Sequence, residues 1–519
     1  MAKAIKSRWI LILWVIAFVI IKIPVLHYPF FWDESWSYAP GVKLMYQHGP
    51  SLMPNAIDLY YSRGHPMLFY AAAAVWMHIF GPSLVSQHCF GLFISVLLLI
   101  SVYEVCLRLF NKNVALLGLL LVSGQVIFFV QSTMLLPEVM IALLSLLTLY
   151  YYATQKYWQT FLACTALVFT KESGMTLGLV LGAHACIYCF SKTATPTQKL
   201  KNFLPVMGAG ICIGAFFLLQ KKLNGWYLFP EHTGLIDMSW GMFKGKLRFC
   251  AEIIFYQQFR GWVFLFLMLL SALAAIKTKN FRYALPAIIG LLVYMYIGEH
   301  MGYITRRLFI PFIFSVLVYT VYTFNKLNSD TKSDANRFLY LTLFYLGAYL
   351  SFSSLNFFTN RYLFCTIVLF LILAAWALEI VTSQLKNTYV FLLCDCAVII
   401  ACAFKFSTAV NDTSMGMYPA MEVQQDIVNY FETNKLYTKE ISAYSQLQRV
   451  HLTRPFTGFR HTTDSFIHVV PNPTPTTDYI IQDNIEADSL KHDNAVPAGF
   501  KEVYTTKKGD AWGIIYGKQ

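Results

Sequence analysis

The chain has 519 residues, of which 57% are hydrophobic, 17% aromatic and only 13% charged, and its formal net charge is +13. This amino-acid composition is far more apolar than that of a soluble globular domain, and it excludes an ordinary soluble enzyme. The Lys and Arg residues fall mostly in short loops between apolar runs, a pattern typical of topology control in membranes, so we expect membrane lipids and no nucleic acid as partners.

Long apolar runs recur along residues 1–408. A helix satisfies its own backbone hydrogen bonds in lipid, and about 20 apolar residues cross the hydrocarbon core. The runs predict about 13 transmembrane helices by this length rule, at residues 9–26, 84–107, 114–131, 135–153, 157–170, 174–190, 203–220, 261–276, 283–298, 308–324, 338–356, 362–381 and 388–407. We therefore expect an all-α polytopic membrane domain over residues 1–408.

The tail, residues 409–519, has a different composition. It carries 10 Lys and Arg against 13 Asp and Glu, whereas the whole chain carries 40 against 27. A helical stretch at 421–435 is followed by short alternating runs at 478–481 and 512–516, and proline-rich turns separate them. We expect the tail to form a small soluble α/β domain outside the membrane.

The charges also predict orientation. Alternate loops are basic and nearly free of acid, beginning with Lys3, Lys6 and Arg8. Such loops stay in the cytoplasm, so the N-terminus is cytoplasmic and, after an odd number of spans, the tail is extracytoplasmic. The short loops and compact tail favour a bacterial inner membrane.

The first outer loop, residues 27–83, contains two amphipathic segments at 36–48 and 67–80. Both are too short to span and suit the membrane interface, where they would bracket a cavity. The loop begins with Phe31-Trp32-Asp33-Glu34-Ser35-Trp36, in which two carboxylates follow the first span directly. A charge beside hydrocarbon is costly, so we predict that Asp33 is catalytic and that Glu34 contacts substrate; the alternative is helix capping, because acids favour a helix N-terminus.

The same loop continues with Arg63-Gly64-His65-Pro66. Arg63 and His65 can both donate hydrogen bonds to an anionic phosphate. Either side chain could instead simply be solvated. We include both among the predicted substrate-binding residues.

Two further outer turns carry charge. Glu138 follows Leu136-Pro137, and together with Asp33 it could bind an acceptor or a divalent cation, although hard cations usually need more ligands than these. Lys171 and Glu172 at the next turn are either part of a phosphate pocket or a solvated pair. We expect all three to contact substrate.

Arginines on the outer side oppose the orientation rule. Arg306 and Arg307 precede one apolar run, and Arg361-Tyr362 precede another. A guanidinium matches the geometry of phosphate, so we expect these residues to bind a lipid-linked phosphate. The alternative is that each arginine snorkels to the lipid headgroups.

Taken in order, these motifs resemble the polyprenyl-phosphate-sugar-dependent glycosyltransferases of the GT-C superfamily, in particular the dolichyl-phosphate-mannose protein mannosyltransferases and lipid A aminoarabinose transferases. The likeness covers roughly residues 1–380 and rests on Trp32-Asp33-Glu34, His65-Pro66-Met67, Leu136-Pro137-Glu138 and Thr170-Lys171-Glu172-Ser173-Gly174. Family members often have Lys-Pro-Pro or His-Pro-Pro at the second motif. Their Arg-Tyr-x-x-Pro pattern is split here between Arg307 with Pro311 and Arg361-Tyr362, so either arginine could face the donor phosphate.

The resemblance implies an inverting glycosyltransferase with Asp33 at the reaction centre. It would move a sugar from a polyprenyl-phosphate donor to a lipid, glycan or protein acceptor on the extracytoplasmic face. No cofactor is required by this chemistry; a divalent cation at Asp33 and Glu138 is the alternative.

A lipid or solute transporter, or a flippase, is the rival interpretation. Transporters usually hold functional charges near the middle of the membrane on broken helices, whereas the charges here gather toward one surface. A non-catalytic membrane sensor with a ligand-binding tail is a second rival. The sensor interpretation predicts no loss of function when the Asp33 region is altered.

Overall fold

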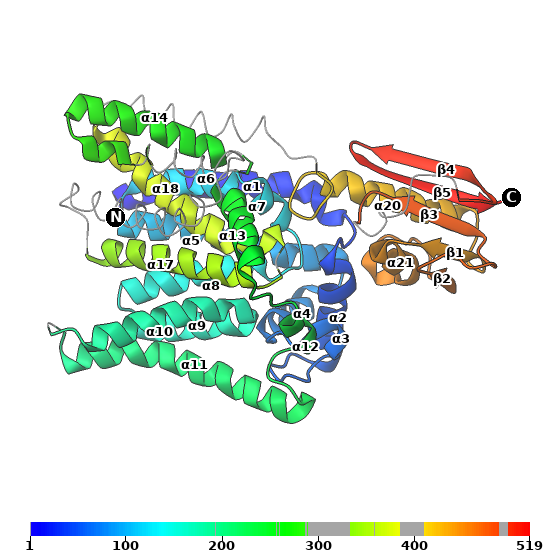
Figure 1. The fold of residues 1–519 in the computed structure, drawn as a ribbon, viewed down its shortest axis with the longest axis horizontal. Coiled ribbons are helices and arrows are strands. Elements are labelled where there is room, and N and C mark those ends of the chain that lie inside the picture. The colour runs from blue at the N-terminus through cyan, green and yellow to red at the C-terminus, as the bar shows by residue number, and fades with distance from the viewer. Residues whose placement is uncertain are drawn as a thin grey trace.

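The computed structural model describes residues 2–285, 288, 333–384, 409–486 and 497–519, apart from residues 193, 256, 259 and 358. Its helices run side by side in an elongated bundle, and a small sheet domain lies at one end (Figure 1). The main bundle helices are α1 (Ala2–Lys22), α5 (Leu84–Leu109), α6 (Lys112–Ser123), α8 (Glu138–Ala153), α9 (Tyr157–Thr170), α10 (Met175–Cys189), α11 (Pro196–Asn224), α13 (Trp240–Phe255), α14 (Arg260–Thr278), α17 (Ser333–Leu355) and α18 (Phe364–Gln384).

The described residues contain five segments long and apolar enough to cross a membrane, namely Arg8–His27, Leu84–Leu109, Pro196–Asn224, Ser333–Leu355 and Asn360–Gln384. The chain is accordingly an integral membrane protein. The larger number of spans predicted from the sequence is not confirmed. The expected spans at 308–324 and 388–407, and most of the one at 283–298, lie outside the described residues.

The expected span at 114–131 is divided in two. Helix α6 ends at Ser123, and α7 (Val126–Gln131) begins after Gln125, whose backbone is extended. The buried Gln125 side chain donates to the carbonyl of Leu121 at 2.9 Å, so it satisfies an acceptor that the break leaves free. At about 1.5 Å per residue α6 is roughly 18 Å long, well short of the roughly 30 Å hydrocarbon core.

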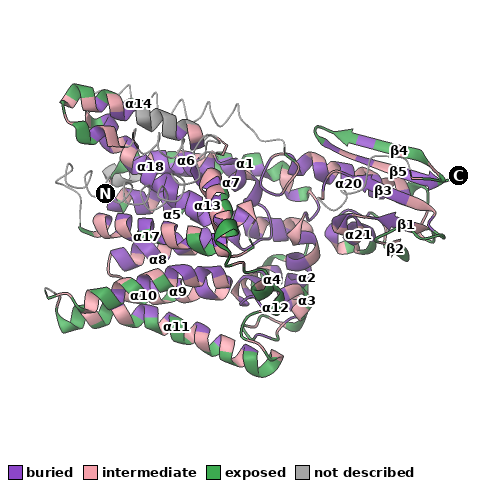
Figure 2. Cartoon of the chain, viewed as in Figure 1, coloured by how far each residue is buried: buried purple, intermediate pink, exposed green. Residues whose placement is uncertain are grey.

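Burial separates central helices from peripheral ones (Figure 2). Helix α18 is buried almost all round, with 89% of its most apolar window inside the protein, whereas the corresponding value for α11 is 33%. A helix that is apolar on every side belongs in the middle of a bundle or in lipid. The short helix η5 (Asn360–Leu363), which leads into α18, has Arg361 and Leu363 buried.

The first outer loop folds into short helices at one end of the bundle, beside α12 (Pro230–Gly234) (Figure 1). After η1 (Ile23–His27), which leads into the loop, these are a π-helical turn η2 (Glu34–Tyr38), α2 (Ala39–His48), α3 (Leu59–Ser62) and α4 (Leu68–Phe80). Helices α2 and α4 correspond to the two amphipathic segments expected in the interface. They pack closely because Gly41 lies against the Tyr70 ring, where an added Cβ would come within 2.7 Å.

The tail is an α/β domain, as expected. Its sheet has the order β2-β1-β3-β5-β4, in which β1 is parallel to β2 and β3, and β5 is antiparallel to β3 and β4. The elements are α20 (Met417–Thr433), β1 (Glu440–Ala443), α21 (Gln446–Thr453), η6 (Pro455–Thr457), β2 (His468–Val470), β3 (Tyr479–Asp483), β4 (Phe500–Lys508) and β5 (Ala511–Lys518).

The tail is docked onto the first outer loop. The backbone N–H of Phe30 donates to the carbonyl of Thr457 at 2.8 Å, and Arg454 donates to the carbonyl of Trp36 at 3.4 Å. Tyr28 donates to the Glu422 carboxylate at 2.9 Å. These contacts lie on both sides of Asp33 in the sequence, so the tail braces the segment that carries it.

Candidate active site

Charged side chains from distant turns meet at the end of the bundle where the tail is docked. They come from the loop before η2, the first turn of α8, the turn between α9 and α10, η5, and the segment before α20. All of these segments, including the one in the tail, lie on the side that the sequence predicts to be extracytoplasmic. The side chains brought together are Asp33, Glu138, Lys171, Arg361 and Asp412.

Arg361 is the centre of this cluster and is only 1% exposed. Its Nη2 donates to Asp33 Oδ2 and its Nη1 to Asp412 Oδ2, while its Nε lies 3.5 Å from Glu138 Oε1. A buried charge is tolerated only when it is paired and hydrogen-bonded. Three carboxylates therefore share one guanidinium.

Asp33 is the accessible member of the cluster. Its side chain is 23% exposed, and its Oδ1 accepts a 3.0 Å hydrogen bond from the indole of Trp36. Arg361 lies behind it, out of contact with solvent. The arrangement presents a fixed carboxylate to the outside with a buried cation at its back.

Lys171 forms a second, adjoining ion pair. Its Nζ lies 3.3 Å from Glu138 Oε1 and 3.8 Å from the centre of the Tyr362 ring, and the residue is 5% exposed. Glu138 consequently has two cations to share, Lys171 and Arg361. A desolvated ammonium stacked on an aromatic face is well placed to bind an anion.

The third group consists of His65, Glu172 and His232. His65 Nδ1 lies 2.7 Å from Glu172 Oε2, and the two imidazole rings are stacked with their centres 5.0 Å apart. Burial by itself would raise the pKa of Glu172, but His65 and Lys171 lower it to about 2. Burial, reinforced by the charge of His65, lowers the pKa of His232 to about 4, so this imidazole is neutral at neutral pH.

These three residues are the set among the described residues that fits a metal ion, because their ligand atoms all lie within 4.8 Å of one another. Two imidazoles and a carboxylate suit Zn²⁺ or a similar divalent transition metal. The sequence instead pointed to Asp33 and Glu138. Arg361 contacts both of those carboxylates, so its guanidinium takes the position that a bridging cation would need.

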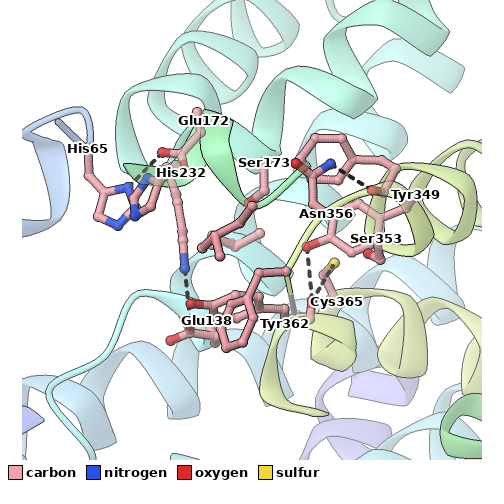
Figure 3. Close-up of a pocket in the computed structure, with 15 residues that line it drawn as sticks. His65, Glu138, Glu172, Ser173, His232, Tyr349, Ser353, Asn356, Tyr362 and Cys365 are labelled. Atoms are coloured by element: carbon pink, nitrogen blue, oxygen red, sulfur yellow. Dashed lines mark hydrogen bonds and ion pairs between the residues drawn. The ribbon is translucent and has the colours of Figure 1, made fainter. Parts of the chain in front are cut away.

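A cavity of about 100 Å³, partly open to solvent, lies next to the ion cluster. Figure 3 shows the His65, Glu172 and His232 group on one side and side chains of α17 on the other. The polar residues that line the cavity include His65, Glu138, Lys171, Glu172, Ser173, His232, Tyr349, Ser353, Asn356 and Tyr362.

Asp33 and Arg361 are not in this lining. They adjoin the cavity through Glu138, which contacts Arg361 and also lines the cavity. Lys171 is thus a cation that a ligand in the cavity would meet directly. Arg361, expected from the sequence to bind phosphate, is placed instead as the ion partner of Asp33.

Two predicted site residues have other partners. Glu34 is 1% exposed; its carboxylate accepts hydrogen bonds from the backbone N–H of Leu135 at 2.5 Å and of Phe31 at 3.2 Å, and it pairs with His88 at 3.3 Å. These bonds use its oxygens, and Glu34 does not line the cavity, so its contacts here support the fold of the loop; the predicted contact with substrate stays a prediction.

Arg63 pairs with the exposed Glu231, and its guanidinium lies 5.2 Å from the Trp36 ring. It also does not line the cavity. The ion pair between Arg63 and Glu231 therefore links the first outer loop to α12. Arg306 and Arg307 lie outside the described residues.

Sequence reasoning missed Asp412 and His232. Asp412 lies in a short polar turn that the sequence assigns to the start of a separate domain, and His232 lies on the short helix α12, within a stretch that the sequence predicts to be a long outer loop. The signal available for Asp412 was a carboxylate close after an apolar run, the same signal that indicated Asp33. No comparable signal marks His232.

Comparison with known proteins supports part of the resemblance. No curated protein matches the sequence. Two crystal structures of ArnT from Cupriavidus metallidurans, one in the apo state and one bound to undecaprenyl phosphate, align with 97% of this chain at 14% identity and a TM-score of 0.47, covering 97% and 98% of those chains. Residues 64–220 match the dolichyl-phosphate-mannose-protein mannosyltransferase family. Over these residues the chain is similar to a family of GT-C glycosyltransferases, as its motifs predicted.

Proposed function

We propose that the protein is an inverting glycosyltransferase that moves a sugar from a polyprenyl-phosphate donor to a lipid, glycan or protein acceptor on the extracytoplasmic face of a bacterial inner membrane. The observation that carries the proposal is the ion pair between the accessible Asp33 and the buried Arg361, next to a cavity lined by Lys171. The family match over residues 64–220 supports the same reaction class.

In this proposal the donor phosphate lies beside Lys171 and His65. Both side chains line the cavity and both can donate hydrogen bonds to an anion. The leaving group is already anionic, so it needs fixed positive charge and not a general acid. The polar groups of Ser353 on α17 and of Asn356, the residue after this helix, line the same cavity and suit the hydroxyls of a sugar.

Asp33 is the proposed base. It takes the proton from an acceptor hydroxyl, the acceptor oxygen forms a bond to the anomeric carbon, and the bond from that carbon to the phosphate oxygen breaks. Polyprenyl phosphate leaves with the electron pair. A positioned base typically contributes about a hundred- to ten-thousand-fold. With a phosphate acceptor no proton needs to be removed, and Asp33 would then orient the acceptor.

We propose that the reaction needs no cofactor. Dialysis of the purified protein against EDTA is expected to leave turnover unchanged. If turnover is lost and Zn²⁺ restores it, a divalent cation held by His65, Glu172 and His232 takes part.

The test is to incubate the purified protein in detergent with a panel of radiolabelled polyprenyl-phosphate sugars and a membrane lipid extract. Transfer of label is expected with at least one donor and is expected to disappear in Asp33→Asn, which keeps the shape of the side chain. Asp464→Asn is the matched control, because Asp464 is exposed on the tail. Retained transfer in Asp33→Asn would refute the assignment.

The same preparation separates the enzyme from the transporter alternative. In sealed liposomes a transporter moves the labelled donor across the bilayer with its sugar–phosphate bond intact, whereas a transferase cleaves that bond. Donor movement without cleavage would overturn the proposal. The orientation is tested with Ser465→Cys, an exposed tail position, which an impermeant thiol reagent should label in whole spheroplasts.

A further inference from the structure

Asp412 belongs to the segment that leads into the tail, yet it is placed in the ion cluster. It is 5% exposed, and its carboxylate accepts from Nη1 of Arg361, whose Nη2 donates to Asp33. The two carboxylates therefore hold opposite corners of one guanidinium. The Nε of Arg361 has no hydrogen-bond partner among the described residues, so these two bonds determine how the guanidinium is turned.

The position of Asp412 is set independently of Arg361. Its backbone carbonyl accepts a 2.6 Å hydrogen bond from the side chain of Gln131, which is 1% exposed on α7. In the same turn, the side chain of Asn411 accepts from the N–H of Thr413 at 2.9 Å. The carboxylate of Asp412 is thus fixed by α7 and by its own turn, and Arg361 is fixed by it.

We infer that Asp412 is a positioning residue of the transfer reaction, which anchors Arg361 so that the guanidinium keeps the carboxylate of Asp33 in its reactive orientation. This inference rests on the proposed function. During transfer Asp33 changes its charge when it accepts a proton, and its hold on Arg361 weakens. Asp412 takes no part in that proton transfer, so it keeps the guanidinium in place through the reaction cycle.

Electrostatics gives this role a distinctive signature. A residue that only stabilises the fold should, when replaced, weaken donor binding and turnover together. Replacing Asp412 by neutral Asn instead removes a negative charge from the surroundings of an anionic phosphate, so binding of undecaprenyl phosphate should not weaken. Turnover should fall, because displacement of a reacting group by about 1 Å can cost roughly a hundredfold.

The experiment compares Asp412→Asn, Asp412→Glu and the exposed control Asp464→Asn in the full-length protein. We measure kcat with the labelled donor and the Kd of undecaprenyl phosphate for each. Asp412→Asn is expected to lower kcat by about 10- to 100-fold, with Kd unchanged or tighter, and Asp412→Glu to recover part of kcat because it keeps the charge. Asp464→Asn should match the wild type in both.

A second variant guards against misfolding. Gln131→Met leaves the Asp412 carboxylate intact but removes the bond that fixes its backbone, so kcat should fall by a smaller factor at constant Kd. Wild-type kcat in Asp412→Asn, or equal losses of binding and turnover in all Asp412 variants, would overturn the inference while the proposed function stands. If the wild type transfers no sugar from any donor, the proposed function fails and the inference fails with it.

Discussion

Lys171 offers a direct test of the phosphate site. Its ammonium lines the cavity, 3.3 Å from Glu138 and 3.8 Å from the centre of the Tyr362 ring. In Lys171→Met the side chain keeps much of its length and loses its charge. A hydrogen bond to a charged group contributes about 1.5–3 kcal/mol, which corresponds to a roughly 10- to 150-fold weaker Kd for undecaprenyl phosphate.

The surroundings of Lys171 place the expected loss toward the upper end of this range. Once the ammonium is gone, the 3.5 Å contact with Arg361 is the ion pair that Glu138 keeps among the described residues, and its carboxylate repels the phosphate. The double variant Lys171→Met with Glu138→Gln removes that repulsion, so it should bind undecaprenyl phosphate more tightly than Lys171→Met alone.

The assay is titration of the detergent-purified protein with undecaprenyl phosphate. Lys439→Met is the matched control, because Lys439 also pairs with a carboxylate, Asp478 at 3.5 Å, but lies exposed on the tail. It should leave Kd unchanged. An unaltered Kd in Lys171→Met would refute the placement of the phosphate, and a double variant no better than the single one would refute the role given to Glu138.

Three further predictions concern stability. Glu34→Ala leaves two backbone N–H donors and the buried His88 without their partner. The free energy of unfolding should fall by about 3 kcal/mol or more, and the unfolding temperature should fall with it. The Kd for undecaprenyl phosphate at 4 °C should not change, and weaker binding would favour a substrate contact for Glu34. Gly91→Ala should also lower the unfolding temperature in calorimetry, because its Cβ would lie 2.6 Å from a backbone carbonyl; an unchanged temperature would contradict this packing. Burial lowers the pKa of His451 well below 6.5, so below that pH the unfolded state binds a proton that the folded state does not. The tail should therefore lose up to about 1.4 kcal/mol of stability per pH unit as the pH falls below 6.5. In His451→Phe, hydrogen exchange in β3 and β5 should depend less on pH, and a dependence equal to that of the wild type would refute the assignment.

Much of the candidate active site could be predicted, because its charged residues lie at the ends of apolar runs, where they are conspicuous in the sequence. Asp33, Glu138, Lys171 and Arg361 each begin or end an apolar run, and the structure brings all four together. Local sequence could not show which side chain meets which. Arg361 and Asp33 are 328 residues apart in the chain, and their pairing depends on how the whole bundle packs.

The differences between the expectations and the structure have local physical causes. Glu34 is next to Asp33 in the sequence, but on the π-helical turn η2 neighbouring side chains point in different directions, and Glu34 turns inward to Leu135. Hydropathy over 114–131 is continuous, so it could not reveal the extended backbone at Gln125 that separates α6 from α7. The polar composition of the tail suggested independence from the membrane domain, and it concealed the fact that Asp412 enters the ion cluster.

The late position of Asp412 has a consequence for biosynthesis. Arg361 emerges from the ribosome about 50 residues before its partner Asp412, a gap of several seconds at ordinary translation rates of about 5–20 residues per second. During that interval the guanidinium has Asp33 and Glu138 but lacks its remaining carboxylate. A nascent chain that stops before Asp412 would hold an incomplete ion cluster, so the cluster is completed only after the segment before α20 has been made.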